Sequence, residues 1–336
     1  MTTASSGRAS GKIILFGEHA VVHGAPGLAA GIERGATAHL EIGAPGPATL
    51  ELGGRAVEPA RDGDDLARAF AALVDAAPLP EATRDGFRVR VATEIAPGGG
   101  LGCSAAIGVS VARAIEATGS ADGAEERAAR RASAWEGVFH GNPSGIDTAA
   151  ALSGGFFRFV RGVGATPIEH PHDLHFAIGY SGSSASTKEM VAGIARIKER
   201  HPDRIAKFVE AVGSLVRNAE LAIAANDAEA LGKLLDLNQM LLAGLMLSTD
   251  AIERMREAAK DAGSLGTKLT GSGGGGSVIA LARDAEGARR IAEAWRAAGF
   301  DAFPTCVRAR GHASATRHEP HDAPPTLEPT AEDPGV

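Results

Sequence analysis

Glycine residues in this chain are gathered into runs, and these runs constrain the fold more than any other feature of the sequence. The chain contains 44 glycines in 336 residues, and two dense runs occupy residues 98–102 and 271–276. Because glycine has no Cβ, its backbone can adopt left-handed conformations and can approach a ligand closely. Each run therefore predicts either a loop that binds a ligand through its backbone or, alternatively, a flexible connector.

The first run lies between a predicted strand and a predicted helix. Residues 87–91 alternate apolar and basic side chains, as a half-buried strand does, and residues 103–118 have the apolar spacing of a helix. Between them stands the sequence Pro97-Gly-Gly-Gly-Leu-Gly-Cys-Ser-Ala-Ala. A glycine loop that opens a helix places unhindered N–H groups at the positive end of the helix dipole. This arrangement predicts an anion-binding site.

The same run differs from two well-known phosphate-binding patterns. No lysine follows its glycines, as a P-loop would require. No acidic residue ends a following strand about 20 residues further on, as a dinucleotide-binding motif would require. The predicted phosphate site therefore belongs to another family of proteins.

The rest of the pattern predicts a chain of mixed helices and strands. Strands are expected at residues 12–16, 37–42, 155–160, 175–180, 277–282 and 302–308. Helices are expected at residues 64–76 and 123–139, in four stretches between residues 186 and 262, and at residues 285–298. Residues 311–336 have almost no large apolar side chains, so we expect a disordered tail there. This order of elements is typical of an α+β protein.

Two acidic residues and one lysine are candidates for chemistry at the phosphate site. Glu136 lies towards the end of the predicted helix 123–139, Asp147 follows in a Gly/Pro turn, and Lys12 opens the first predicted strand. Phosphoryl transfer to an alcohol requires neutralisation of phosphate charge and usually a carboxylate near the attacking hydroxyl. Taken singly, these residues could equally be a solvated helix residue, a turn cap and a surface charge. Their placement inside longer motifs favours the chemical interpretation.

Three ordered motifs resemble those of the GHMP kinases, a family named for galactokinase, homoserine kinase, mevalonate kinase and phosphomevalonate kinase. The glycine run at residues 97–106 resembles their central motif. A second segment resembles their N-terminal motif; it reads Gly11-Lys-Ile-Ile-Leu-Phe-Gly-Glu-His-Ala-Val-Val-His-Gly-Ala-Pro. A third segment resembles their C-terminal motif; it reads Lys268-Leu-Thr-Gly-Ser-Gly-Gly-Gly-Gly-Ser-Val. The resemblance implies an α+β fold of two domains. Residues 1–168 would form an ATP-binding domain like domain 2 of ribosomal protein S5, and residues 169–310 a ferredoxin-like domain with added helices.

The resemblance also implies a role for each candidate. Asp147 would accept the hydroxyl proton while Lys12 contacts the aspartate and the reacting hydroxyl, and Ser104 and Glu136 would hold Mg²⁺. The residues expected to bind ATP are Pro97, Gly98, Gly99, Gly100, Leu101, Gly102, Cys103, Ser104 and Ala105. Cys103 departs from the family, which usually has two adjacent serines here. It could be a passive buried group, which its size favours, or a reactive thiol.

Residues 17–24, Gly-Glu-His-Ala-Val-Val-His-Gly, resemble the mevalonate kinases of this family more than the galactokinases. That resemblance implies phosphorylation of mevalonate to 5-phosphomevalonate, a step of isoprenoid biosynthesis. Glu18, His19, Thr187 and Gly273 are the candidates for contact with the substrate. The cation that would face the substrate carboxylate is left open. The alternatives are another acceptor, such as a phosphomevalonate or a sugar, and a catalytically silent nucleotide-binding protein.

Composition limits the partners and the compartment. The net charge is -7, with one tyrosine and two tryptophans, so a nucleic-acid partner is not expected. No segment holds the roughly 18 apolar residues that a membrane span needs. The two cysteines lie far apart and form no CxxC pair, which suggests a reducing compartment. We therefore expect a cytoplasmic monomer or homodimer that acts on a small molecule.

Overall fold

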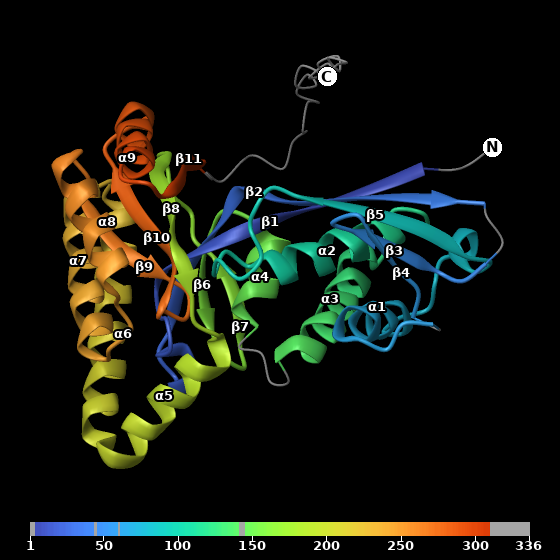
Figure 1. Ribbon diagram of the computed structural model, residues 1–336, viewed down its shortest axis with the longest axis horizontal. Coiled ribbons are helices and arrows are strands. Elements are labelled where there is room, and N and C mark those ends of the chain that lie inside the picture. The colour runs from blue at the N-terminus through green and yellow to red at the C-terminus, as the bar shows by residue number, and fades with distance from the viewer. Residues whose placement is uncertain (1–3, 44–45, 60, 141–144, 310–336) are drawn as a thin grey trace, which may run out of the picture.

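The computed structural model describes residues 4–43, 46–59, 61–140 and 145–309, without the side chains of residues 4 and 140. The expected tail at residues 311–336 lies outside these ranges. The described chain forms two sheets, each with its own helices (Figure 1). The first sheet ends with β7 (Gly164–Pro167) and the second begins with β8 (Leu174–Ser184), so the proposed domain division at residues 168–169 falls between these strands.

The first sheet has seven strands, in the order β4-β3-β5-β2-β6-β7, with β1 paired to β2 outside this path. Its other strands are β1 (Ala4–Phe16), β2 (Gly27–Ile42), β3 (Thr49–Leu52), β4 (Arg55–Val57), β5 (Phe87–Thr93) and β6 (Phe156–Val160). One edge of β2 pairs with β1 along most of its length, and the other pairs with β6 and then β5. The β3–β5 pair is parallel, and the remaining pairs are antiparallel.

Helices cover one face of this sheet. They are α1 (Asp65–Asp75), α2 (Cys103–Glu116), α3 (Ala124–His140) and α4 (Ile146–Ser153), with short 3₁₀ helices at Val21–His23 and Glu81–Thr83. α2 packs against β1 and β2. On the side of α2 away from the sheet, α3 packs against α2 and α1 packs against α3 (Figure 1). Because α2 is enclosed by the sheet and by α3, nearly all of its side chains are small or apolar.

The second sheet has the strand order β11-β8-β10-β9, and its pairs are all antiparallel. Besides β8 it contains β9 (Gly266–Thr270), β10 (Gly275–Ala282) and β11 (Asp301–Val307). Its helices are α5 (Thr187–Arg200), α6 (Pro202–Ala224), α7 (Ala228–Gly244), α8 (Asp250–Asp261) and α9 (Ala285–Ala297). Counted from β8, the order 4-1-3-2 is that of a ferredoxin-like sheet, as expected. In the described ranges, none of the helices combines the length and apolar character needed to cross a lipid bilayer.

Polar residues cap the helices of this second half. Asp227, Thr249 and Asp284 each accept a hydrogen bond from a first-turn N–H group, in α7, α8 and α9 respectively. Ser186 forms a capping box with Glu189 at the start of α5. Such caps satisfy N–H groups that have no partner within a helix. The caps at Asp227 and Thr249 mark where α7 and α8 begin within the long helical pattern between residues 186 and 262.

The structure corrects the expected start of the first strand. β1 begins at Ala4 rather than at Lys12. Its first residues are small because β1 runs close to α2: a Cβ at Gly7 would lie 2.2 Å from the Ser110 carbonyl oxygen. A strand buried by backbone contact in this way lacks the large apolar residues by which strands are recognised.

A further local expectation was wrong, because Asp147 lies in the first turn of α4 rather than in an irregular turn. Glu136 lies near the end of α3, as expected. The sequence pattern also did not predict β9, because its five residues carry the start of the second glycine motif and no clear alternation. Asp147 lies two residues after Gly145, and β9 leads into the second glycine run; apolar spacing is least informative beside glycines.

A buried ion pair ties three helices together beneath the first sheet. Arg131 on α3 is fully buried, and its Nε donates to Glu116 Oε1 on α2 at 2.7 Å. The same guanidinium donates to the carbonyl oxygens of Val74, at 2.7 Å, and Pro78, at 2.9 Å. Because Arg131 uses its donors on both a carboxylate and backbone carbonyls, it fixes the end of α1 against α2 and α3.

We predict that Glu116→Gln destabilises the protein strongly, because it leaves Arg131 buried without its counter-charge. The expected loss in the free energy of unfolding is about 3–5 kcal/mol. Glu125→Gln is the matched control, since Glu125 pairs with Arg113 at an exposed site, and it should cost less than about 1 kcal/mol. Urea denaturation followed by circular dichroism measures both. Equal losses in the two variants would contradict the assignment.

Candidate active site

The first glycine run is the loop that leads into the start of α2. Gly102 is the N-cap of α2, in a left-handed conformation with φ 73°, and no side chain caps the helix there. Gly98 and Gly100 are also left-handed, with φ 75° and 79°. The first-turn N–H groups of α2 are thus left for a ligand rather than for a capping side chain. Such a helix start favours a bound phosphate.

The second glycine run packs directly against the first. Ser277 Oγ donates to the Gly99 carbonyl oxygen at 2.6 Å. A Cβ at Gly100 would lie 3.0 Å from the Thr270 carbonyl oxygen, and one at Gly271 would lie 3.3 Å from Gly100 Cα. There is therefore no space for side chains between the two runs, and their glycines let the two sheets meet at this point.

Lys12 and Asp147, the two predicted catalytic residues, form an ion pair beside this loop. Lys12 Nζ lies 3.2 Å from Asp147 Oδ1; the lysine side chain is 4% exposed and the aspartate side chain 35% exposed. The backbone N–H of Lys12 donates to the Leu101 carbonyl oxygen at 2.9 Å. A Cβ at Gly102 would lie only 2.9 Å from Lys12 Cγ. Strand β1, the glycine loop and α4 thus converge on one carboxylate that remains partly accessible.

Ser104 and Glu136, the predicted metal ligands, are also adjacent. Ser104 Oγ donates to Glu136 Oε1 at 2.6 Å, and Trp135 Nε1 donates to the Ser104 carbonyl oxygen at 3.0 Å. Glu136 is 2% exposed, so its carboxylate is held at the base of the loop. A hydroxyl and a carboxylate are hard oxygen ligands of the kind that Mg²⁺ prefers, and these two residues fit such an ion.

Cys103 occupies the first position of α2 and is buried. Its Sγ donates to the Ile95 carbonyl oxygen at 3.5 Å, and burial raises the pKa of the thiol to about 11. A thiol with that pKa remains protonated near neutral pH and is a poor nucleophile. The structure therefore favours the passive role for Cys103.

Three of the four predicted substrate residues gather around one segment of the second glycine run. His19 Nε2 lies 2.8 Å from the Ser272 carbonyl oxygen, and Thr187 Oγ1 donates to Ser272 Oγ at 3.4 Å. Gly273 follows directly, with φ 77°. His19 is itself left-handed, with φ 57°, which is a strained conformation for a residue with a Cβ. Such strain persists when the surroundings hold the residue in place.

Glu18, the fourth predicted substrate residue, lies elsewhere. Its buried carboxylate pairs with Lys268 Nζ and accepts a hydrogen bond from Asn238 Nδ2 at 3.2 Å. Burial lowers the pKa of Lys268, and the neighbouring Glu18 opposes that shift by favouring the charged form. The pair links the segment before His19 to β9 and α7. The sequence did not identify Lys268 and Asn238 as partners of Glu18, because they lie 250 and 220 residues from it along the chain.

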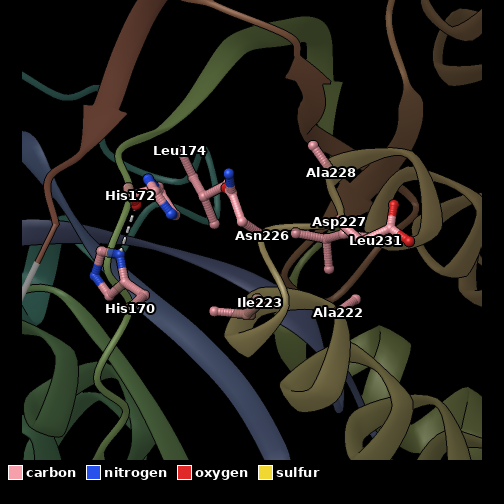
Figure 2. Close-up of a pocket in the computed structure, with 9 residues that line it drawn as sticks. All are labelled: His170, His172, Leu174, Ala222, Ile223, Asn226, Asp227, Ala228 and Leu231. Atoms are coloured by element: carbon pink, nitrogen blue, oxygen red, sulfur yellow. Dashed lines mark hydrogen bonds between the residues drawn. The ribbon is translucent and has the colours of Figure 1, made fainter.

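A separate small recess lies away from these residues. Figure 2 shows it between the segment that precedes β8 and the turn that joins α6 to α7. Its lining is His170, His172, Leu174, Ala222, Ile223, Asn226, Asp227, Ala228 and Leu231. It contains none of the predicted site residues, so the convergence of the glycine runs, rather than this recess, defines the candidate active site.

The comparisons with known proteins agree with this geometry. The family model "GHMP kinases N terminal domain" matches residues 65–155, and the model "GHMP kinases C terminal" matches residues 219–301. The mevalonate kinase of Pyrococcus furiosus is 33% identical over 327 residues, which cover 90% of this chain and 96% of that protein. The mevalonate kinase of Methanothermobacter thermautotrophicus is 35% identical, with coverage of 82% and 89%.

A solved structure is similar throughout its length. The L. major mevalonate kinase in complex with R-mevalonate has a TM-score of 0.79 and 27% identity, and the match covers 92% of this chain and 97% of that one. The two family models and the relatives named mevalonate kinase identify a phosphotransferase that acts on an alcohol group. With both of its domains matched, the chain belongs to the GHMP kinase family.

We predict that Gly102→Ala impairs the loop beyond the cost of its backbone strain. The new Cβ would press on Lys12 and displace it from Asp147, so nucleotide affinity and turnover should both fall about tenfold or more. Gly263→Ala is the matched control, because Gly263 has φ 89° but open space around its Cβ. Calorimetric nucleotide binding and turnover distinguish the two variants. If both retain wild-type binding, the close approach at Gly102 has no functional importance.

We also predict that His19 makes stability depend on pH. Burial lowers the pKa of His19 below its ordinary value of 6.5, against smaller opposing effects of the Ser272 carbonyl and Glu18. The unfolded chain then binds more protons than the native protein, so this contribution is present above pH 6.5 and is lost as pH falls through the folded-state pKa. His19→Gln should flatten the pH dependence of the free energy of unfolding, measured by urea titration. His172→Gln, at an exposed histidine, is the control, and an unchanged slope in His19→Gln would contradict the prediction.

Proposed function

We propose that this chain phosphorylates the primary alcohol of mevalonate with ATP, giving 5-phosphomevalonate and ADP. The single observation that carries the proposal is the 3.2 Å pair of Lys12 and Asp147 beside the glycine loop at the start of α2. An alcohol acceptor placed there would have a carboxylate at its hydroxyl and backbone N–H groups around the transferred phosphate. These are the requirements of phosphoryl transfer to an alcohol.

We propose Asp147 as the proton acceptor. Its carboxylate is partly exposed, whereas the ammonium of Lys12 behind it is buried, so an incoming hydroxyl reaches both groups from the open side. As the hydroxyl oxygen bonds to the terminal phosphorus of ATP, the bond from phosphorus to the ADP oxygen breaks and the hydroxyl proton passes to an Asp147 carboxylate oxygen. Lys12 holds the aspartate in place and adds positive charge where negative charge develops.

We propose the glycine loop and the start of α2 as the phosphate-binding element. Residues 97–105 supply N–H groups that can bind phosphate oxygens without any side chain between them. Ser104 and Glu136 would hold Mg²⁺, because their oxygens lie 2.6 Å apart at the start of α2. When bound, that ion would neutralise charge on the phosphate oxygens. Trp135 supports this arrangement by fixing the Ser104 backbone.

The acceptor is inferred from the relatives and from the second glycine run. The proteins from Pyrococcus furiosus and Methanothermobacter thermautotrophicus are both named mevalonate kinase. In this chain His19 and Thr187 meet at Ser272, and we propose that this side of the site contacts mevalonate. We propose that Glu18 acts indirectly: by pairing with Lys268 it holds the segment that carries His19.

We predict that Asp147→Asn loses most turnover with little change in folding. The amide keeps the shape of the side chain but cannot accept the proton, so kcat should fall about 10²- to 10⁴-fold while the thermal midpoint stays close to that of the wild type. Asp301→Asn, at an exposed position of β11, is the matched control and should retain turnover. A coupled assay of ADP release with mevalonate, phosphomevalonate, galactose and homoserine measures activity and acceptor choice.

Three outcomes would count against the proposal. An Asp147→Asn enzyme with wild-type turnover would remove the aspartate from the reaction. Preference for another acceptor in the panel would keep the kinase but overturn mevalonate as its substrate. ATP binding without ADP release on any acceptor would indicate a catalytically silent protein.

A further inference from the structure

A group of metal-ligating side chains lies at the opposite end of β8 from the glycine loops. Cys306 on β11 is the cross-strand partner of His175 on β8, so the two side chains stand side by side on one face of the sheet. Asp173 lies two residues before His175. One ligating atom from each of Asp173, His175 and Cys306 lies within 4.8 Å of the others. Asp173 is exposed, and the other two are partly buried.

We propose that Asp173, His175 and Cys306 form a binding site for Zn²⁺. Thiolate, imidazole and carboxylate are the three side-chain ligands that zinc takes in proteins, and three protein ligands with a fourth position for water form a common tetrahedral set. The sulfur and imidazole ligands make Mg²⁺ or Ca²⁺ poor occupants, because these ions select oxygen. The site is accessible to a hydrated ion because its aspartate is on the surface.

The backbone around the group already holds all three ligands in place. Cys306 and His175 are fixed by the β11–β8 pairing. Asp173 Oδ1 accepts a hydrogen bond from the Ala309 N–H at 2.6 Å, which ties the carboxylate to the chain just beyond β11. A carboxylate has a second oxygen that can bind a metal. A bound ion would therefore join β11 to β8 and to the segment that precedes β8.

The charges that face this group favour a cation overall. Glu33 faces Cys306, and Asp284, the N-cap of α9, faces His175. The opposing positive charges are Arg308, whose guanidinium is paired with Glu33 at 3.0 Å, and Arg290, which interacts with Asp284. With Asp173, Glu33 and Asp284 as the carboxylates, three negative charges face two positive ones, so the local field favours a cation.

A cysteine, a histidine and an aspartate could also be a nucleophilic triad, but the arrangement here opposes that role. In such a triad the carboxylate orients the histidine, and the histidine activates the thiol. Here the thiol interacts with Asp173 itself, and burial followed by the charge of Asp173 raises the pKa of Cys306 to about 11. A thiol in this state is a weak nucleophile, whereas a bound metal would displace its proton.

The site is distinct from the proposed Mg²⁺ site. His175 and Ser184 lie at opposite ends of β8, nine residues apart in register, or about 30 Å along a strand. Ser184 lies at the glycine-loop end, where a Cβ at Gly98 would be 3.7 Å from its Oγ. Zinc binding and kinase turnover can therefore be tested independently.

The test uses the full-length protein under reducing conditions, with Co²⁺ as a spectroscopic probe and Zn²⁺ in a chelator competition. The wild-type protein should bind one equivalent of metal. Cys306→Ser and His175→Ala should lose that metal or bind it more weakly, by at least the roughly 10- to 100-fold typical of removing an outer-shell partner. Bound Co²⁺ should give a thiolate charge-transfer band that Cys306→Ser abolishes. His172→Ala, at an exposed histidine nearby, is the control and should bind like the wild type.

A second readout guards against variants that fold poorly. Zn²⁺ should raise the thermal midpoint of the wild type and of His172→Ala but not of Cys306→Ser, because a ligand stabilises only a protein that binds it in the native state. The proposal is overturned if wild-type Co²⁺ spectra show no thiolate band. It is equally overturned if Cys306→Ser and His175→Ala keep wild-type zinc affinity, since the metal would then be held adventitiously by other histidines.

Discussion

The rest of the structure depends on the close approach of two glycine segments from different sheets. A side chain at Gly100 would meet the Thr270 carbonyl oxygen at 3.0 Å, and Ser277 Oγ reaches the Gly99 carbonyl oxygen at 2.6 Å. Only backbones without side chains can pack this closely. This contact brings the first glycine run, at the start of α2, against the second glycine run, between β9 and β10.

Buried ion pairs lie around that contact. The exposed fraction of the carboxylate separates the two fully buried pairs from the Lys12–Asp147 pair. Arg131 with Glu116, and Lys268 with Glu18, are buried on both sides of the pair, so each joins elements that solvent does not reach. In the Lys12–Asp147 pair only the lysine is buried. A carboxylate that is held by a buried ammonium and is still partly exposed can meet a substrate. Removing a partner from a fully buried pair should instead destabilise the fold.

Strand β8 connects two regions of different chemistry. At one end it meets the glycine loop, near the oxygen ligands Ser104 and Glu136, which suit Mg²⁺. At its other end His175 stands beside Cys306, and these softer ligands suit zinc. The difference in ligand type would keep two ions apart in one small protein. An ion at the second region would act on the edge strand β11 rather than on phosphoryl transfer.

Local sequence was enough to predict the elements with strong spacing and the residues inside the motifs. The helix expected at residues 64–76 is α1 at Asp65–Asp75, and the first glycine run leads into α2 as expected, because capping, helical period and glycine conformation are local properties. The first strand could not be delimited, since its small residues are explained only by the backbone of α2. Likewise, the sequence motif placed Glu18 beside His19 at the substrate, whereas folding buried it against Lys268. Pairings across the chain depend on which surfaces meet, and that is a property of the packed protein rather than of any segment.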